Sequence, residues 1–413
     1  MTKEFIYLLQ LLESVVNRHP APLPPDGISW EALYQDANSQ SLCAIVFAAV
    51  DSLLGEVRPP EGIMQAWRMQ AILLGTAQMQ KNHALKKLLM RVDAEGLRVL
   101  LVKGPVLASL YPSPASRTSV DADVLIESAD LQAVSRVFED EGYSFNEEAS
   151  TDNENTFIGE FLNVELHERL WEEAAGRRYD RLDALGIGRM DNAVNIEVAG
   201  IKMRTLPPQE MMFYLIYHMV KHFFVCGIGI RYISDLTLYA ENYADAINWD
   251  KFWADIDSLE YMSFAKCFLH LCVKYMGLSA GDIKLPEISL EDALRAERML
   301  TDFAEGGHNG RKTLVRYKAG RILRVCYENE HIKVPRSRWT IFRQMFFPKK
   351  SELKNRNIAN VKYSKFLLFA WVQHLLSLFM RWFKLREERC SLSDRIDCAQ
   401  ERFDLLHDLG LIE

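Results

Sequence analysis

The region that decides the fold lies between residues 99 and 126 and reads VLLVKGPVLASLYPSPASRTSVDADVLI. Val99–Val102 is a short apolar run typical of a buried strand, and Lys103–Pro105 leads into a helix with proline in its first turn, where proline is tolerated. The run Val120–Ile126 then returns to the pattern of a strand. A strand, a short helix and a second strand in close succession predict a compact α+β unit.

The patterns on either side of this region divide the chain into three parts. Residues 97–205 contain further short runs of alternating polarity, which predict more strands around a helix at 131–140. Residues 1–96 and 206–413 carry apolar residues at spacings of three and four, the period of helices. We therefore expect an α+β domain over 97–205, preceded by a helical segment over 1–96 and followed by an all-α domain over 206–413.

The composition is that of an ordinary globular protein. Apolar residues make up 49% of the 413 positions and charged residues 25%, which excludes a disordered, collagen-like or coiled-coil chain. The seven cysteines are an odd number without a Cys-x-x-Cys pair, so we expect reduced thiols rather than a disulfide framework or a zinc site. The first residues lack the apolar segment of a secretory signal, so we expect a cytoplasmic location.

Positive charge is concentrated toward the C-terminus. Residues 306–389 hold 20 lysines and arginines against five acidic residues, although the whole chain has a formal net charge of −7. Such a block attracts phosphate, an acidic partner or an anionic membrane surface. Its alternative role is to complement the acidic remainder of the chain. Within it, Phe366–Met380 is mostly apolar with basic flanks, which fits either an interfacial helix in peripheral contact with a membrane or a buried helix of a bundle.

Acidic residues on two of the expected strands point to a metal site. Residues two apart on a strand share a face, so Asp121 and Asp123 present paired carboxylates. Glu165 lies on a second alternating strand, 163–167, and becomes a third ligand if the two strands are neighbours. Carboxylate oxygens are the ligands that Mg²⁺ and Mn²⁺ prefer. His167 shares the strand face of Glu165 and either reaches this site or has a structural role.

Basic residues near the same strand point to a phosphate group. Lys103 and Gly104 stand where a helix begins, and the free N–H groups of a helix N-terminus attract anions. Arg117 lies four residues before the first aspartate. Metal ions and basic groups together stabilise the charge that develops in phosphoryl-type transfer. We expect Lys103, Gly104 and Arg117 to contact nucleotide phosphates, with ordinary surface charges as the alternative for the two basic side chains.

A later helical region carries a further set of polar residues. His218 and His222 are four residues apart, a spacing that can chelate zinc, but the metalloprotease pattern is absent. In a second interpretation His218, Lys221 and Arg231 line the cleft and contact nucleotide or acceptor, while Asp235 orients one of them. In a third interpretation these residues form a structural polar cluster between helices.

These residues resemble a known family, the nucleotidyltransferase fold of the DNA polymerase β superfamily, and within it the bacterial group of uncharacterised nucleotidyltransferases. The resemblance is carried by Val102-Lys103-Gly104-Pro105, Arg117, Asp121-Ala122-Asp123, Val164-Glu165-Leu166-His167, His218, Lys221-His222, Arg231 and Asp235-Leu236. It implies a mixed β-sheet with flanking helices and metal ions held by Asp121, Asp123 and Glu165. It also implies transfer of an NMP from an NTP to an acceptor, with Mg²⁺ or Mn²⁺ as cofactor.

The sequence departs from the pattern of this family at two places. Lys103-Gly104 stands where the wider superfamily has Gly-Ser or Gly-Gly, and Glu165 stands where aspartate is commoner. The expected acceptor is an unidentified small molecule, glycan or protein, and nucleic acid is not an expected partner. One alternative is a non-catalytic nucleotide-binding or scaffold protein with a basic helical lobe. The other is a metal-dependent glycosyltransferase that uses Asp121-Ala122-Asp123 for a sugar nucleotide.

Overall fold

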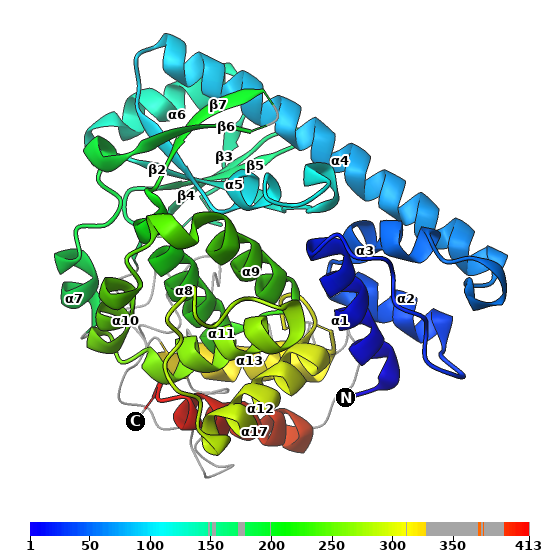
Figure 1. The fold of residues 1–413 in the computed structure, drawn as a ribbon. Coiled ribbons are helices and arrows are strands. Elements are labelled where there is room, and N and C mark those ends of the chain that lie inside the picture. Colours follow the sequence, from blue (N-terminus) through cyan, green and yellow to red (C-terminus); the bar gives the residue numbers. More distant parts are fainter. Residues whose placement is uncertain are drawn as a thin grey trace.

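The chain forms a sheet unit and a body of helices, joined by one long helix, α4, that runs from the N-terminal helices to the sheet (Figure 1). The computed structural model describes residues 1–147, 149–150, 154–171, 178–198, 200–310, 312–327, 371–372, 375 and 392–412. Most of the basic block 306–389, including nearly all of Phe366–Met380, lies outside the described residues.

The larger sheet is mixed and has five strands in the order β1-β2-β5-β4-β3. The strands β2 and β5 pair in parallel, and the other neighbours pair antiparallel. The bounds are Val99–Val102 for β1, Asp121–Ile126 for β2, Ser144–Phe145 for β3, Glu154–Ile158 for β4 and Asn163–His167 for β5. The helix α5, Gly104–Ala108, connects β1 to the segment that leads into β2.

The two faces of this sheet have different neighbours. On one face, Ala122, Val124 and Ile126 of β2 pack in a core with α6 (Leu131–Asp140) and the C-terminal end of α4 (Glu61–Ala94). The hairpin of β6 (Val194–Val198) and β7 (Ile201–Thr205) joins the same core. On the other face, Leu125 packs with the helical body. The alternation of side chains along β2 therefore turns Asp121 and Asp123 toward the helices.

The helical body consists mainly of helices that follow the β6–β7 hairpin. One of them begins with a capping box, in which the side chain of Ser289 accepts from the backbone N–H of Asp292 while the side chain of Asp292 accepts from the backbone N–H of Ser289. The bounds are Tyr179–Ala184 (α7), Pro208–Val225 (α8), Arg231–Tyr243 (α9), Trp249–Ser258 (α10), Met262–Met276 (α11), Leu290–Gly306 (α12), Leu314–Tyr327 (α13) and Leu392–Asp408 (α17). Within the described ranges, no helix has the length and apolar content needed to cross a membrane.

The N-terminal helices share a core with the C-terminal ones. Leu8 and Leu12 of α1 (Lys3–Val16) belong to one hydrophobic cluster with residues as distant in sequence as Leu409. The helices α2 (Trp30–Ser39) and α3 (Cys43–Asp51) contribute to the same cluster. The predicted α+β class, with a mixed sheet, flanking helices and helical regions before and after it, is confirmed. The helices α1 to α3 and the described helices that follow β7, which are separate along the sequence, therefore share one core.

Candidate functional site

A pocket of about 350 Å³ lies between the sheet and the helical body. The strands β2, β4 and β5 contribute most of its acidic lining, and α8 and α9 contribute its tyrosines. Its lysines and arginines come both from these two helices and from segments next to the strands. The pocket is lined by every residue that the sequence analysis proposed for the site: Lys103, Gly104, Arg117, Asp121, Asp123, Glu165, His218, Lys221 and Arg231. The structure therefore brings these residues together, although their individual contacts differ from the expectations.

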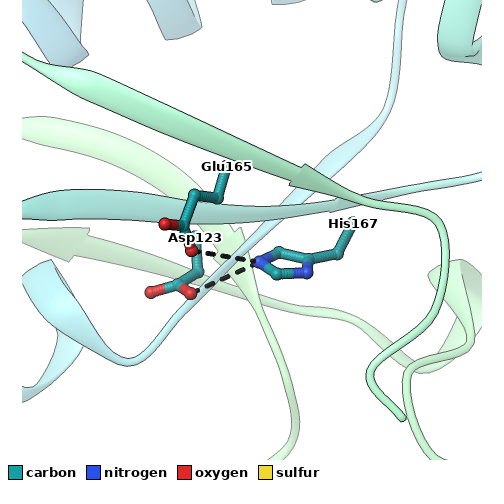
Figure 2. A group of neighbouring side chains, drawn as sticks. All are labelled: Asp123, Glu165 and His167. Atoms are coloured by element: carbon teal, nitrogen blue, oxygen red, sulfur yellow. Dashed lines mark ion pairs between the residues drawn. The ribbon is translucent and has the colours of Figure 1, made fainter. Parts of the chain in front are cut away.

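The parallel pairing of β2 with β5 sets the acidic residues side by side. Its register places Asp123 opposite Glu165 and Leu125 opposite His167. Figure 2 shows the imidazole of His167 turned toward both carboxylates, with Nε2 at 3.4 Å from Oδ1 of Asp123 and 3.8 Å from Oε2 of Glu165. One ligand atom from each of the three residues lies within 4.8 Å of the others. A single cation with ligand distances of about 2.0–2.6 Å holds neighbouring ligand atoms at separations of this size.

Two carboxylates of the pocket, those of Asp121 and Glu165, have raised pKa values. Asp121, two residues before Asp123 on the same face of β2, has a raised pKa because it is largely buried and lies near the charge of Asp123. Burial, followed by the charges of Asp121 and Asp123, raises the pKa of Glu165 to about 8. A cation bound among these groups would relieve their repulsion. Two or three carboxylates around one position form the donor set that Mg²⁺ or Mn²⁺ prefers.

The imidazole of His167 is a further candidate ligand. Its Nε2 is buried and makes no hydrogen bond to any described residue, although it faces Asp123 and Glu165. Buried polar atoms of native proteins nearly always have a partner, so this nitrogen fits a site that a cation completes. Imidazole suits transition metals, whereas Mg²⁺ prefers oxygen ligands alone. The residues that would hold a metal are thus Asp123, Glu165 and His167, with Asp121 lining the same pocket.

Lys103 places a positive charge in direct contact with the carboxylate of Asp123. Its ammonium lies 2.7 Å from Oδ1 of Asp123 and donates to Nε2 of His218, also at 2.7 Å. Burial alone would raise the pKa of Asp123, but Lys103 and His167 hold it well below its usual range. Gly104 follows as the first residue of α5, a helix of only five residues. Phosphate contacts of Lys103 and Gly104 remain predictions.

Arg117 is paired with a protein carboxylate. Its Nε donates to Oδ1 of Asp235 at 2.9 Å and its Nη2 donates to Oδ2 at 2.7 Å, with both residues buried. The hydroxyl of Tyr111 donates to the same carboxylate at 2.8 Å. We expected Asp235 to orient His218, Lys221 or Arg231; its closest partner is Arg117, and Nε of Arg231 lies 4.0 Å from its Oδ2. The segment before β2 packs against α9, and the periodicity of α9 carries no information about that contact.

Arg231 links α9 to two loops. Its Nη1 donates to the carbonyl of Thr118 at 2.8 Å, and its Nη2 donates to Nε2 of His308 at 2.9 Å. The sequence analysis did not identify His308, which lines the pocket and whose ring stacks on that of Tyr232. The sequence signal that could have identified His308 as a pocket residue is its place among glycines, because glycines let the backbone approach other elements closely.

The two histidines of α8 lie against each other and against Lys103. Nε2 of His218 is 2.9 Å from Nε2 of His222 and also accepts from the Lys103 ammonium. Burial and the neighbouring charge of Lys103 lower the pKa of His218 well below its usual value, so its ring is neutral. Because an ammonium already approaches this nitrogen, the geometry favours the pocket-lining interpretation of His218 over a zinc-chelating pair. Lys221, on the same helix, also lines the pocket.

The fold and the pocket define an α+β protein with a candidate cation site next to lysine and arginine side chains of the same pocket. The chain belongs to the family of uncharacterised nucleotidyltransferases, whose profile matches residues 26–277. No curated protein matches the sequence. A similar solved structure is that of an antigenic nucleotidyltransferase-like protein from Paracoccidioides brasiliensis, with 9% identity and a TM-score of 0.31 over 51% of this chain and 92% of that one.

Proposed function

We propose that the chain is a metal-dependent nucleotidyltransferase that transfers an NMP from an NTP to an acceptor and releases pyrophosphate. Membership of the family supports the reaction class. The observation that carries the proposal is the meeting of Asp121, Asp123 and Glu165 in one pocket with Lys103 and Lys221. A triphosphate with its metal ions needs both kinds of group, because carboxylates hold the metal and ammonium groups hold phosphate oxygens.

The carboxylates of the pocket are suitable ligands for the metal, and its basic groups are suitable partners for the phosphates. Metal ions held by Asp123, Glu165 and His167, with Asp121 as a further carboxylate ligand, would polarise the phosphate oxygens and offset the negative charge that develops. Lys103 and the other basic groups of the pocket would bind the β- and γ-phosphates that leave. Catalysis of this kind depends mainly on positioning and electrostatic stabilisation.

The reaction balances as a single displacement at the α-phosphorus. An oxygen of the acceptor forms a bond to the α-phosphorus, and the bond from that phosphorus to the oxygen bridging to the β-phosphate breaks. Pyrophosphate leaves with the electrons of that bond, and the acceptor loses its proton to a carboxylate of the pocket or to water. The acceptor is a small molecule, glycan or protein that presents a hydroxyl or phosphate.

Two labelled nucleotides test the proposal. The purified protein is incubated with Mg²⁺ or Mn²⁺, each NTP carrying label at the α- or γ-phosphate, and a cell extract as a source of acceptors. We expect α-label on an acceptor and γ-label in pyrophosphate, with neither product from Asp123→Asn. Nucleotide binding without either product for any NTP would favour the non-catalytic alternative instead.

A further inference from the structure

The ammonium of Lys103 contacts the carboxylate at the centre of the candidate metal site. Its Nζ lies 2.7 Å from Oδ1 of Asp123, and Nε2 of His167 lies 3.4 Å from the same oxygen. An ion bound between Asp123 and the near nitrogen of His167 would therefore lie next to the oxygen that Lys103 contacts.

The fold itself places Lys103 in this position. Its φ is 59°, in a backbone region that residues with a side chain rarely adopt. It stands between the buried strand β1 and the buried Gly104, and its side chain is only 13% exposed. The neutral ring of His218 accepts from the same ammonium at 2.7 Å. Two partners and an uncommon backbone conformation therefore hold the lysine against Asp123.

A divalent cation and the Lys103 ammonium compete for this oxygen. A metal at about 2.0–2.6 Å from Oδ1 of Asp123 would leave two positive centres within a few ångströms in a buried site, where Coulomb repulsion is strong. A nucleotide removes the conflict, because its triphosphate offers the ammonium another anionic partner. Lys103 lines the pocket in which the triphosphate would lie.

We propose that Lys103 is a resident cation of the site, which competes with the metal for Asp123 and moves to the triphosphate when a nucleotide binds. This inference rests on the proposed function, because it takes an NTP as the ligand. It makes metal and nucleotide binding cooperative, since each ligand favours the position of Lys103 that the other requires. By linkage, the coupling has the same size in both directions.

Separate binding measurements on the full chain test the exchange without turnover. Mn²⁺ alone is titrated, with free Mn²⁺ followed by its electron paramagnetic resonance signal, and a fluorescent NTP analogue is titrated in EDTA. Lys103→Met removes the ammonium and keeps an unbranched side chain. Lys202→Met, at an exposed position of β7, is the matched control. Lys103→Gln, which keeps a hydrogen-bond donor for Asp123, makes the test independent of whether the methionine variant folds.

We expect both Lys103 variants to bind Mn²⁺ more tightly than the parent protein. We expect them to bind the analogue in EDTA about ten- to a hundredfold more weakly, the factor for losing one charge-assisted contact. The Lys202 variant should match the parent in both titrations.

Unchanged or weaker Mn²⁺ binding by the Lys103 variants would overturn the competition, and unchanged analogue binding would overturn the transfer to phosphate. Pyrophosphate release by the parent without these effects would reject this inference alone. The two binding effects without any turnover would reject the proposed function alone.

Discussion

We expect Asp235→Asn to lower the free energy of unfolding by about 3–5 kcal/mol, the cost of removing one partner from a buried ion pair. Asp235 and Arg117 are 4% and 5% exposed. The carboxylate accepts two hydrogen bonds from the guanidinium and one from Tyr111. Asparagine keeps the shape but loses the charge, so Arg117 stays buried without its close counterion. Each charge-assisted hydrogen bond contributes about 1.5–3 kcal/mol, so the two bonds from Arg117 together correspond to about 3–6 kcal/mol, which overlaps the expected change.

Urea denaturation followed by circular dichroism measures this change. Asp257→Asn, at an exposed position of α10, is the matched control and should change stability by less than about 0.5 kcal/mol. The double variant Arg117→Met with Asp235→Leu removes both charges and should be more stable than Asp235→Asn. Equal denaturation midpoints for Asp235→Asn and Asp257→Asn would refute the assignment of a stabilising role to the ion pair.

The loss of stability in Asp235→Asn depends on pH in a direction that the pKa of Asp235 defines. Although burial favours the neutral form of Asp235, Arg117 holds its pKa below the usual value. A carboxylate with a depressed folded pKa stabilises the protein above its unfolded pKa, about 3.9, and loses that contribution as pH falls through the folded pKa. The stability difference between parent and Asp235→Asn should therefore be constant from about pH 7 to pH 5 and shrink below about pH 4.

Three further predictions concern the site and the basic block. Asp121→Asn and Asp123→Asn should each abolish pyrophosphate release while circular dichroism shows an intact fold, and the exposed Asp140→Asn should not; turnover at the parental rate in either of the first two would reject the assigned carboxylates. His167→Ala should weaken Zn²⁺ binding more than Mg²⁺ binding, as measured by calorimetry, because imidazole suits Zn²⁺ better; equal losses would exclude His167 as a ligand. The block 306–389 should bind anionic liposomes in flotation assays at about 0.1 M salt and release them at about 1 M, as screening increases; no binding at low salt would favour a role in complementing the acidic remainder of the chain.

Local periodicity was sufficient to predict the strands of the site and the faces of their side chains. Because successive side chains on a strand point to opposite faces, Ala122 and Val124 must face away from Asp121 and Asp123 once one face is buried. The predicted separation of apolar and acidic faces along β2 agrees with the cluster that packs against α6. Glu165 could be placed on an alternating strand by the same rule, but its pairing with β2 remained conditional.

Tertiary packing decided what these residues contact. The parallel register that sets Asp123 opposite Glu165 joins strands about forty residues apart, and no local pattern encodes such a pairing. The same holds for Arg117, whose partner Asp235 lies 118 positions away on α9. His308 comes to the pocket from a glycine-rich loop without any periodic signal. The sequence by itself determined which residue types and faces were available, whereas the packing of the helical body against the sheet determined their partners, because burial and charge act between groups that only the folded chain brings together.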